Sequence, residues 1–187
     1  MTALLRFDGV TCVRGGRTLF EQLDLDVRAG ETLRLSGPNG CGKSSLLRLA
    51  AGLLRPAAGT VEAAPAALAD DALALDRELP LVAALMFWNG PDGRSMEMLL
   101  DTLNLGGLIG VPVRLLSTGQ KKRAALARIA ATNAPLWLLD EPVNGLDGEG
   151  FRDLAELIDA HTATGGAVVA ASHVELPGDW RELELGR

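Results

Sequence analysis

The sequence is poor in residues that mark several common protein classes. It has no tyrosine, aromatic residues make up 4% of the chain, and there are two cysteines and two histidines. Two cysteines cannot build a disulfide-rich secreted scaffold. Moreover, Cys41 lies inside a glycine-rich segment that a bond to Cys12 would distort. We therefore expect both thiols to be reduced and the protein to work in the cytoplasm.

The chain also lacks a basic surplus and long apolar runs. Its net charge is −6 and its pI about 4.9, which argues against sequence-independent binding to nucleic acid because that needs a basic surface. The longest near-apolar stretch, 79–88, contains Pro80 and is too short to span a bilayer. The first residues show no basic region followed by an apolar core, so we expect no signal peptide. These absences predict a soluble protein without nucleic-acid partners.

The composition and the first part of the chain indicate one domain that begins with β structure. With 187 residues, of which 48% are hydrophobic, the chain can bury a sizeable core. Leu23, Leu25 and Val27 alternate with charged residues, which is the period-2 pattern of a strand with one wet face. Turns are expected at 15–16 and 29–30 because both contain glycine. This pattern predicts an antiparallel layer near the N-terminus.

Beyond residue 115, helical and apolar segments alternate. The predicted elements are a helix at 120–132, a strand at 136–139, a helix at 149–161 and a strand at 167–171. This order implies parallel strands with right-handed crossovers. Before it, from 79 to 115, short helical runs alternate with breakers such as 89–93. We predict one α/β domain with a core at 1–76 and 116–187 and a small inserted helical subdomain at 77–115.

A glycine-rich segment fits the phosphate-binding pattern G-x-x-x-x-G-K-[ST]. It consists of Gly37, Pro38, Asn39, Gly40, Cys41, Gly42, Lys43, Ser44 and Ser45. An apolar run at 32–36 precedes it and a helical run at 44–54 follows. In such a loop, backbone N–H groups wrap the phosphates, the lysine contacts the β- and γ-phosphates, and the serine after it ligates Mg²⁺. A glycine turn with a surface lysine is the simpler alternative, but the strand–loop–helix context favours nucleotide binding.

The apolar run at 136–139 ends in two acids, Asp140 and Glu141. Open α/β sheets keep their sites at the carboxyl ends of parallel strands. We expect Asp140 to hold Mg²⁺ through its water shell, and Glu141 to orient and deprotonate the water that attacks the γ-phosphate. A strand that ends in a solvated turn is the alternative, and a phosphate loop upstream makes it less favoured.

The segment 116–120 opens the helix predicted at 120–132. Ser117 is a natural N-cap, and Gly119 allows close approach of another backbone. Taken alone, this segment is better explained as a simple helix cap. Together with the acidic strand end that follows it, however, it resembles the signature motif of one large family of ATPases.

Five segments, in the family's order, resemble motifs of the ATP-binding subunits of ATP-binding-cassette (ABC) transporters. They are the phosphate loop (Walker A) at 37–45, the signature motif at 116–120, Walker B with its catalytic glutamate at 138–141, the D-loop at 144–147 and a switch histidine at His173. The resemblance implies a P-loop ABC-ATPase core that binds ATP and Mg²⁺ and hydrolyses ATP.

The resemblance also implies a homodimer in which two copies stack head to tail around each ATP. The phosphate loop of one copy would face Ser117, Gly119 and Gln120 of the other. Glu141 would be the catalytic base, and His173 would hydrogen-bond the γ-phosphate. His161, late in a predicted helix, we expect to be a surface residue or a cation at the helix C-terminus.

The sequence departs from the family in two places. Family members usually carry a glutamine between Walker A and the helical subdomain, whereas the two glutamines here are Gln22 and Gln120. Since carboxylates also suit Mg²⁺, the candidates to replace it are Asp70, Asp71 and Asp76. The aromatic residue that often stacks on adenine is missing too, and the guanidinium of Arg14 is a candidate substitute.

Within the family, three segments resemble the ATPase subunits of bacterial haem exporters of cytochrome c maturation; they are 17–20, 135–142 and 164–173. This resemblance implies a peripheral protein on the cytoplasmic face of the inner membrane. Its expected partners are a polytopic membrane subunit and a haem-handling membrane protein. Because the chain has no Cys-x-x-Cys-His motif, we expect any haem contact to come from those partners.

Three questions stay open at the level of sequence. The segment 81–88 is a candidate docking face for the membrane partner, with core packing as the alternative. The chain can also be the ATPase of another ABC exporter. Finally, the missing glutamine suggests an alternative function, an ATP-sensing regulatory module with little turnover. Turnover is nevertheless favoured by the presence of Lys43, Ser44, Asp140, Glu141 and His173.

Overall fold

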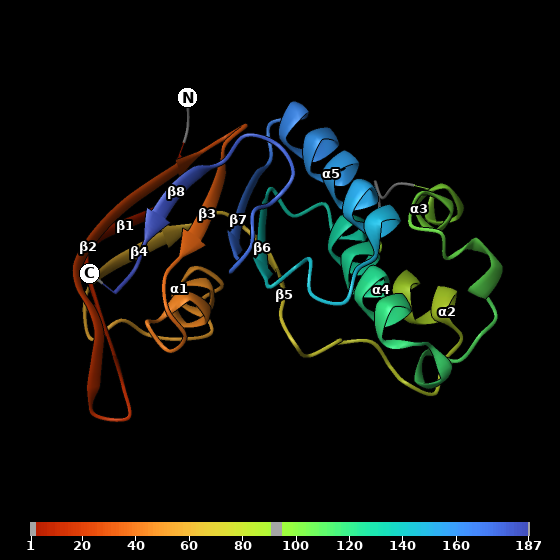
Figure 1. Cartoon of the computed structure of the whole chain (residues 1–187), viewed down its shortest axis with the longest axis horizontal. Coiled ribbons are helices and arrows are strands. Elements are labelled where there is room, and N and C mark those ends of the chain that lie inside the picture. Colours follow the sequence, from red (N-terminus) through yellow and green to blue (C-terminus); the bar gives the residue numbers. More distant parts are fainter. Residues whose placement is uncertain (1–2, 91–94, 187) are drawn as a thin grey trace.

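The computed structural model describes residues 3–90 and 95–186, which form two sheets and the helices around them. The strands are β1 (Ala3–Arg14), β2 (Arg17–Arg28), β3 (Thr32–Ser36), β4 (Ala58–Ala63), β5 (Ala66–Ala69), β6 (Leu136–Asp140), β7 (Ala167–Ala171) and β8 (Arg181–Glu184). The α-helices are α1 (Lys43–Ala50), α2 (Leu81–Met86), α3 (Met96–Thr102), α4 (Thr118–Ala131) and α5 (Gly148–Ala163). Figure 1 shows the sheets and α1 in one half of the molecule and α2, α3 and α4 in the other.

The N-terminal strands form a three-stranded antiparallel sheet in the order β2-β1-β4. The turn between β1 and β2 contains Gly15 and Gly16 at φ 55° and 74°, a backbone conformation that glycine adopts without steric cost. In β2, Leu25 and Val27 are buried and the acid between them is exposed, as expected for a strand with one wet face. The predicted antiparallel layer is therefore confirmed.

The second sheet has five parallel strands in the order β5-β6-β7-β3-β8. β6 and β7 are buried along almost their whole length, which is typical of parallel strands covered on both faces. The predicted α/β class with parallel strands is confirmed. Two strands of this parallel sheet were absent from the sequence-based prediction. β5 is made of alanine and leucine, β8 consists of three charged residues and one leucine at a sheet edge, and neither carries a strong local β signal.

Helix α1 is shorter than the sequence predicts. It ends at Ala50, whereas the helical run was expected to continue to 54. The cause is Gly52, which adopts φ 70°, while the N–H of Leu53 donates to the carbonyl oxygen of Arg48 at 2.9 Å. A left-handed glycine with such a backward hydrogen bond closes a helix end.

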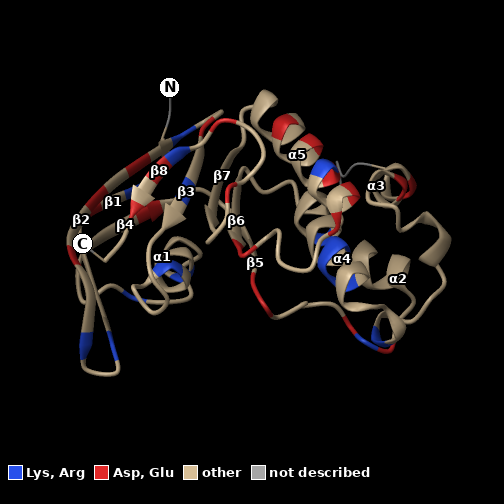
Figure 2. Ribbon diagram, in the orientation of Figure 1, with Lys and Arg blue, Asp and Glu red and all other residues tan. Residues whose placement is uncertain are grey.

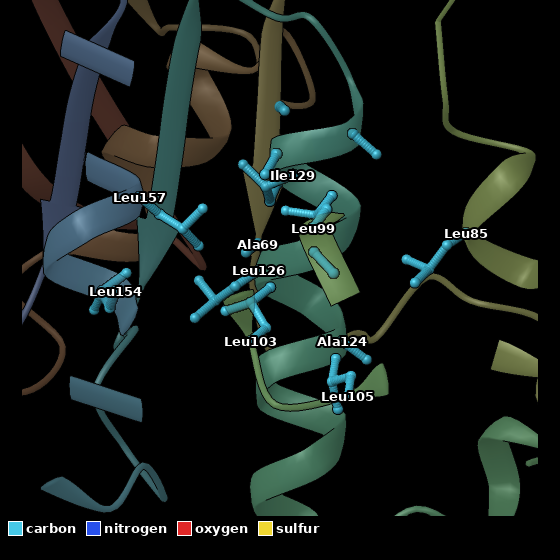
Figure 3. Close-up of a cluster of buried hydrophobic side chains, with 14 of the residues drawn as sticks. Ala69, Leu85, Leu99, Leu103, Leu105, Ala124, Leu126, Ile129, Leu154 and Leu157 are labelled. Carbon is cyan, nitrogen blue, oxygen red and sulfur yellow. The ribbon is translucent and has the colours of Figure 1, made fainter. Parts of the chain in front are cut away.

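Two hydrophobic clusters pack on opposite faces of the parallel sheet. One contains Leu138 of β6 together with leucines of α1, and the other contains Leu139 of β6 together with residues of α4 and α5. Successive side chains of a strand point to opposite faces, so β6 contributes to both clusters. Figure 3 shows part of the second cluster, where Leu126 of α4 and Leu157 of α5 lie near Leu99 of α3.

The described part of the span predicted as an inserted subdomain contains short helices joined by turns. It contains α2, α3 and two 3₁₀ turns at Gly106–Leu108 and Val113–Leu115. Of the breakers expected at 89–93, residues 91–93 lie outside the described residues. The division from the core at 77 and 115 stays a prediction.

The segment 81–88 divides into a buried and an exposed part. Leu81 and Leu85 of α2 are fully buried, whereas Met86 is 62% and Phe87 82% exposed. Trp88 is half-buried and packs against the second cluster. Core packing therefore explains the first part of this segment, and Met86 and Phe87 remain available for a partner.

Candidate functional site

The glycine-rich loop connects β3 to α1, and its backbone depends on glycine. Gly37, Gly40 and Gly42 have φ values of 127°, 79° and 116°, which L side chains rarely adopt. A Cβ atom on Gly37 would lie 2.3 Å from the carbonyl oxygen of Leu185. No larger residue fits at position 37 without displacing the backbone of the C-terminal segment.

Lys43 begins α1 and is only 7% exposed. Its Nζ donates hydrogen bonds to the carbonyl oxygens of Gly37 (2.7 Å) and Pro38 (3.2 Å). These bonds hold the ammonium through carbonyl dipoles. The N-terminus of α1 adds the positive end of its helix dipole. This corner of the molecule is therefore suited to an anion.

A cavity of about 470 Å³ opens beside the loop. Six of the nine predicted loop residues line it: Asn39, Gly40, Gly42, Lys43, Ser44 and Ser45. Predicted residues from the strand ends and the D-loop line it as well: Asp140, Glu141, Asn144 and His173. Segments far apart in sequence thus meet around one space of the size that small ligands occupy.

The other three loop residues do not line the cavity. Gly37 and Pro38 contribute the carbonyl groups that hold Lys43. Cys41 is buried in the cluster around α1, and both it and Cys12 are free thiols. Its side chain supports the loop from within the core, so its main chain is the part that can meet a phosphate.

Glu141 follows β6 in a left-handed conformation with φ 47°, which costs a non-glycine residue about 1 kcal/mol. Its N–H donates to the carbonyl oxygen of Ala171 at 2.9 Å and so fixes it against the end of β7. Its Oε1 lies 3.3 Å from Nε2 of His173. Backbone outliers of this kind gather at functional sites, and here the outlier carries the predicted base.

The signature segment lies apart from this cavity. Ser117 caps α4: its Oγ accepts from the N–H of Gln120 at 3.3 Å, and the Gln120 side chain accepts from the N–H of Ser117 at 2.9 Å. A Cβ atom on Gly119 would lie 3.2 Å from the carbonyl oxygen of Gly145 in the D-loop. Within one chain, then, these three predicted nucleotide contacts form a helix start and do not meet the phosphate loop.

Lys122 is a charged residue near the site that the sequence did not single out. Its Nζ donates to the carbonyl oxygen of Asp140 at 3.4 Å. Burial lowers the pKa of Lys122, while carboxylates around it act to raise that pKa; they are Asp71, Asp140, Glu141 and Asp70. Three consecutive basic residues, 121–123, were the available signal, but their partners come from distant segments.

Arg123 ties the same helix to the D-loop. Its Nη2 lies 2.9 Å from Oδ2 of Asp147. Asp147 is the N-cap of α5, and its Oδ1 accepts from the N–H of Gly150 at 2.8 Å. The hydrogen bond from Gly150, assisted by Arg123, lowers the pKa of Asp147. The D-loop is therefore held between α4 and α5.

The structure distinguishes the three aspartates that are candidates to replace the missing glutamine. Asp71 lines the cavity. Asp70 instead pairs with Arg48 at 3.5 Å, and Asp76 accepts a hydrogen bond from the N–H of Glu78 at 2.9 Å.

Two further expectations concern side chains outside the loop. Arg14, the candidate for adenine stacking, does not line the cavity, whereas Leu19 of β2 does. The expectation that His161 lies at the surface is wrong. It is 8% exposed and stacks on Trp137 with ring centroids 3.9 Å apart. The C-terminal end of α5 packs over β6, which buries this ring despite its terminal position.

The oxygen donors of the cavity fit Mg²⁺. The hydroxyl of Ser44 and the carboxylate of Asp140 line the same space, and Mg²⁺ prefers oxygen ligands while it keeps waters and substrate phosphates. Within the described ranges no group of three His, Cys, Asp or Glu side chains is arranged to hold a metal by itself. A metal at this site would therefore take some of its ligands from a bound phosphate.

A phosphate loop with a buried lysine, opposed by an acid pair at the end of a parallel strand, defines a P-loop nucleotide-binding protein. The model of the ABC transporter family matches residues 20–144. The chain belongs to this family, whose ATP-binding subunits are ATPases, and the resemblance drawn from its five motifs is confirmed.

Relatives with full-length similarity come from several bacteria. A protein of Sphingopyxis alaskensis is 52% identical over 191 aligned residues, which cover 100% of this chain and 98% of the relative. A protein of Novosphingobium aromaticivorans is 58% identical over 89% of this chain and 87% of its own. One from Pseudomonas syringae is 39% identical over 100% and 97%. All three are named cytochrome c biogenesis ATP-binding export protein CcmA.

Solved structures agree on the fold. The ATP-binding subunit of an ABC transporter superposes with a TM-score of 0.84 at 23% identity, over 91% of this chain and 80% of that one. An ABC transporter of metal-chelate type, in an inward-facing conformation, gives a TM-score of 0.72 at 28% identity over 92% and 74%. In the described part of this chain, no helix has the length and hydropathy for crossing a bilayer.

Proposed function

We propose that this chain is the ATP-hydrolysing subunit of an ABC export complex, the haem exporter of cytochrome c biogenesis. The observation that carries the ATPase part is the single cavity shared by the phosphate loop, Glu141 and His173. The full-length similarity to proteins named for cytochrome c biogenesis supports the assignment to that system.

The roles of the cavity residues follow from their chemistry. Lys43 and the loop N–H groups bind the β- and γ-phosphates. Ser44 and Asp140 would hold Mg²⁺, which would supply positive charge beside the phosphates. Glu141 orients the attacking water and takes its proton, and His173 hydrogen-bonds the γ-phosphate. The 3.3 Å contact between Glu141 and His173 supports this division because it keeps the base and the phosphate-binding histidine together.

A second copy completes the site. Ser117, Gly119 and Gln120 lie outside the cavity of their own chain, so we propose that they contact the ATP bound by the other copy of a head-to-tail homodimer. The capping box orders the first turn of α4, and the positive end of that helix dipole then faces the γ-phosphate.

The complex requires membrane partners. We propose a polytopic subunit like CcmB and a haem-handling protein like CcmC, with this chain bound peripherally at the cytoplasmic face of the inner membrane. Met86 and Phe87, exposed at the end of α2, are the proposed docking residues, on a helical subdomain at 77–115. Purification from solubilised membranes tests this: a co-purifying CcmB-like subunit with bound porphyrin supports the haem exporter, whereas a different permease indicates another ABC exporter.

The ATPase proposal is tested with two variants. Glu141→Gln should trap an ATP-bound dimer because binding is kept and water activation is lost, whereas Lys43→Ala should abolish binding. Steady-state phosphate release and size-exclusion chromatography measure both. Equal, near-zero turnover of wild type and Glu141→Gln, even with the membrane partner present, would support an ATP-sensing module instead.

A further inference from the structure

The segment that follows β8 packs against the phosphate loop. The N–H of Leu185 donates to the carbonyl oxygen of Ser36 at 2.9 Å, which extends the pairing of β8 with β3 to the start of the loop. The Leu185 side chain is 4% exposed and belongs to the same hydrophobic cluster as Cys41. The loop is therefore packed against residues that lie far from it in sequence.

Two glycines allow this close approach. A Cβ atom on Gly37 would lie 2.3 Å from the carbonyl oxygen of Leu185, so the two main chains are in close contact. Gly186 has φ 91°, and a Cβ atom on it would lie 3.0 Å from Cβ of Cys41 and 3.5 Å from ring atoms of Pro38. None of these five residues lines the cavity. The segment 185–186 thus supports the loop from the side away from the cavity.

These contacts also bear on Lys43. Its buried Nζ donates to the carbonyl oxygens of Gly37 and Pro38 at 2.7 and 3.2 Å. The segment 185–186 adjoins both of these residues. Closely packed interiors transmit a displacement, because their atoms have little free space around them. A shift of 185–186 would therefore move the two carbonyl groups and, with them, the ammonium group.

β8 is itself fixed to its neighbours. It pairs with β3 in parallel over its whole length, and Figure 2 marks both signs of charge on this short strand. Nη2 of Arg34 lies 3.1 Å from Oε1 of Glu182. Nη2 of Arg181 lies 3.5 Å from Oε2 of Glu31. The segment 185–186 therefore leaves the sheet at a defined position beside the loop.

Resting on the function proposed above, we propose that Leu185 and Gly186 are positioning residues for nucleotide binding. They lie outside the cavity and act through the loop. They hold the carbonyl groups of Gly37 and Pro38 in the places from which these groups orient Lys43 toward the β-phosphate. Binding groups that are already in position cost less free energy to order when the ligand arrives. Nucleotide affinity consequently depends on a segment that the nucleotide does not meet.

Gly186→Ala tests the contact with the loop. The new Cβ atom would press on Cys41 and Pro38, so we expect the dissociation constant of ADP with Mg²⁺ to rise about tenfold. Gly178→Ala is the matched control, because Gly178 has φ 96° and a Cβ atom there would meet Nε1 of Trp180 at an ordinary 3.9 Å. Both variants carry the backbone strain of an alanine at positive φ, but only Gly186→Ala should lose affinity.

A second set of variants tests Leu185 and keeps the test decisive if Gly186→Ala does not fold. Leu185→Ala removes the side chain that packs in the cluster with Cys41, and we expect the dissociation constant to rise about fivefold. Leu185→Met keeps the volume and should bind like wild type. Leu157→Ala is the control, because Leu157 is 3% exposed in the other cluster. It should lose stability as Leu185→Ala does and keep its affinity.

Isothermal titration calorimetry of the full chain with ADP and Mg²⁺ measures affinity without turnover. Phosphorus nuclear magnetic resonance of the bound β-phosphate is the second readout, because its chemical shift responds to the position of the Lys43 ammonium. The shift should change in Gly186→Ala and stay at the wild-type value in Gly178→Ala. Urea denaturation of every variant measures stability separately, so weaker binding is distinguished from partial unfolding.

Weaker binding by Gly186→Ala and Leu185→Ala, with both controls like wild type, supports the positioning role. Unchanged affinity in these two variants, or an equal loss in the controls, would overturn it while the nucleotide-binding function stands. Absence of ADP binding by the wild-type chain is a different result: the nucleotide-binding function then fails, and the positioning role fails with it.

Discussion

Nε2 of His173 lies 3.3 Å from Oε1 of Glu141, where the ends of β7 and β6 adjoin at the cavity. Neighbouring parallel strands produce this contact, because Glu141 follows directly on β6 and His173 follows β7 after one intervening residue. The proposed base and the proposed phosphate-binding histidine are therefore positioned by the same sheet edge.

Replacing His173 should impair turnover more than binding. In His173→Ala, the γ-phosphate loses one hydrogen-bond donor and Glu141 loses its neighbour, so we expect the rate of ATP hydrolysis to fall about 100-fold. ATP affinity should stay near wild type because Lys43 and the loop are untouched. Single-turnover phosphate release and equilibrium ATP binding measure the two effects; equal losses in both would contradict the assigned role.

Glycine at position 37 is required by the fold. In Gly37→Ala the new Cβ meets the carbonyl oxygen of Leu185 at 2.3 Å, and φ is 127°. We expect the free energy of unfolding to fall by more than about 2 kcal/mol in urea denaturation. Gly16→Ala is the matched control: its φ is also positive but the space is open, so about 1 kcal/mol is expected. Equal losses would remove the steric argument.

Protonation of Asp147 should lower the free energy of unfolding in acid. Hydrogen bonding from Gly150, with the charge of Arg123, lowers its pKa in the folded state, whereas the unfolded chain binds this proton near pH 4. Below that pH the unfolded state binds more protons, so the free energy of unfolding falls as pH decreases through the folded-state pKa. Asp147→Asn should show a shallower acid dependence in denaturation curves.

Asp153 on the same helix serves as the control of opposite sign. Burial raises its pKa, partly offset by Arg123. Here the folded state binds more protons than the unfolded state. The contribution of Asp153 to stability therefore decreases as pH rises from the unfolded-state pKa to the raised folded-state pKa. Asp153→Asn should remove this decrease and steepen the net loss in acid. If both asparagine variants change the pH dependence in the same direction, the electrostatic account of α5 is wrong.

Phe87 should contribute to docking and hardly to stability. Its side chain is 82% exposed, so Phe87→Ser should change the free energy of unfolding by less than about 0.5 kcal/mol. We expect it to reduce recovery of the membrane subunit in affinity purification. Met98→Ser is the control, since Met98 is exposed on the separate helix α3. Undiminished recovery with Phe87→Ser would exclude this residue from the interface.

Features that depend on neighbours in sequence were predictable. The phosphate loop combines a strand, glycines and a helix start in one continuous segment, and β6 and β7 are apolar apart from the acid that ends β6. β5 and β8 were not, because alanine and charged residues form strands there only through pairing with β6 and β3. The early end of α1 depended on the left-handed conformation of Gly52.

The sequence also failed to predict the environments of two side chains, one charged and one aromatic. In the sequence Lys122 is one of three consecutive basic residues on a predicted helix, and the carboxylates that act on it come from the segment after β5 and from the end of β6. His161 reads as a terminal surface residue, but Trp137 of β6 covers its ring. In both cases tertiary packing decides the environment, and no local pattern encodes it.

Nucleotide binding at the phosphate loop is measured by equilibrium binding of ATP and Mg²⁺ to the wild type and to Lys43→Ala. We expect saturable binding of one ATP per chain by the wild type and a loss of about 100-fold or more in Lys43→Ala, because a buried charged hydrogen-bond donor is removed. Lys121→Ala should bind like wild type. Equal affinity of the wild type and Lys43→Ala would mean that the phosphate loop does not bind the nucleotide.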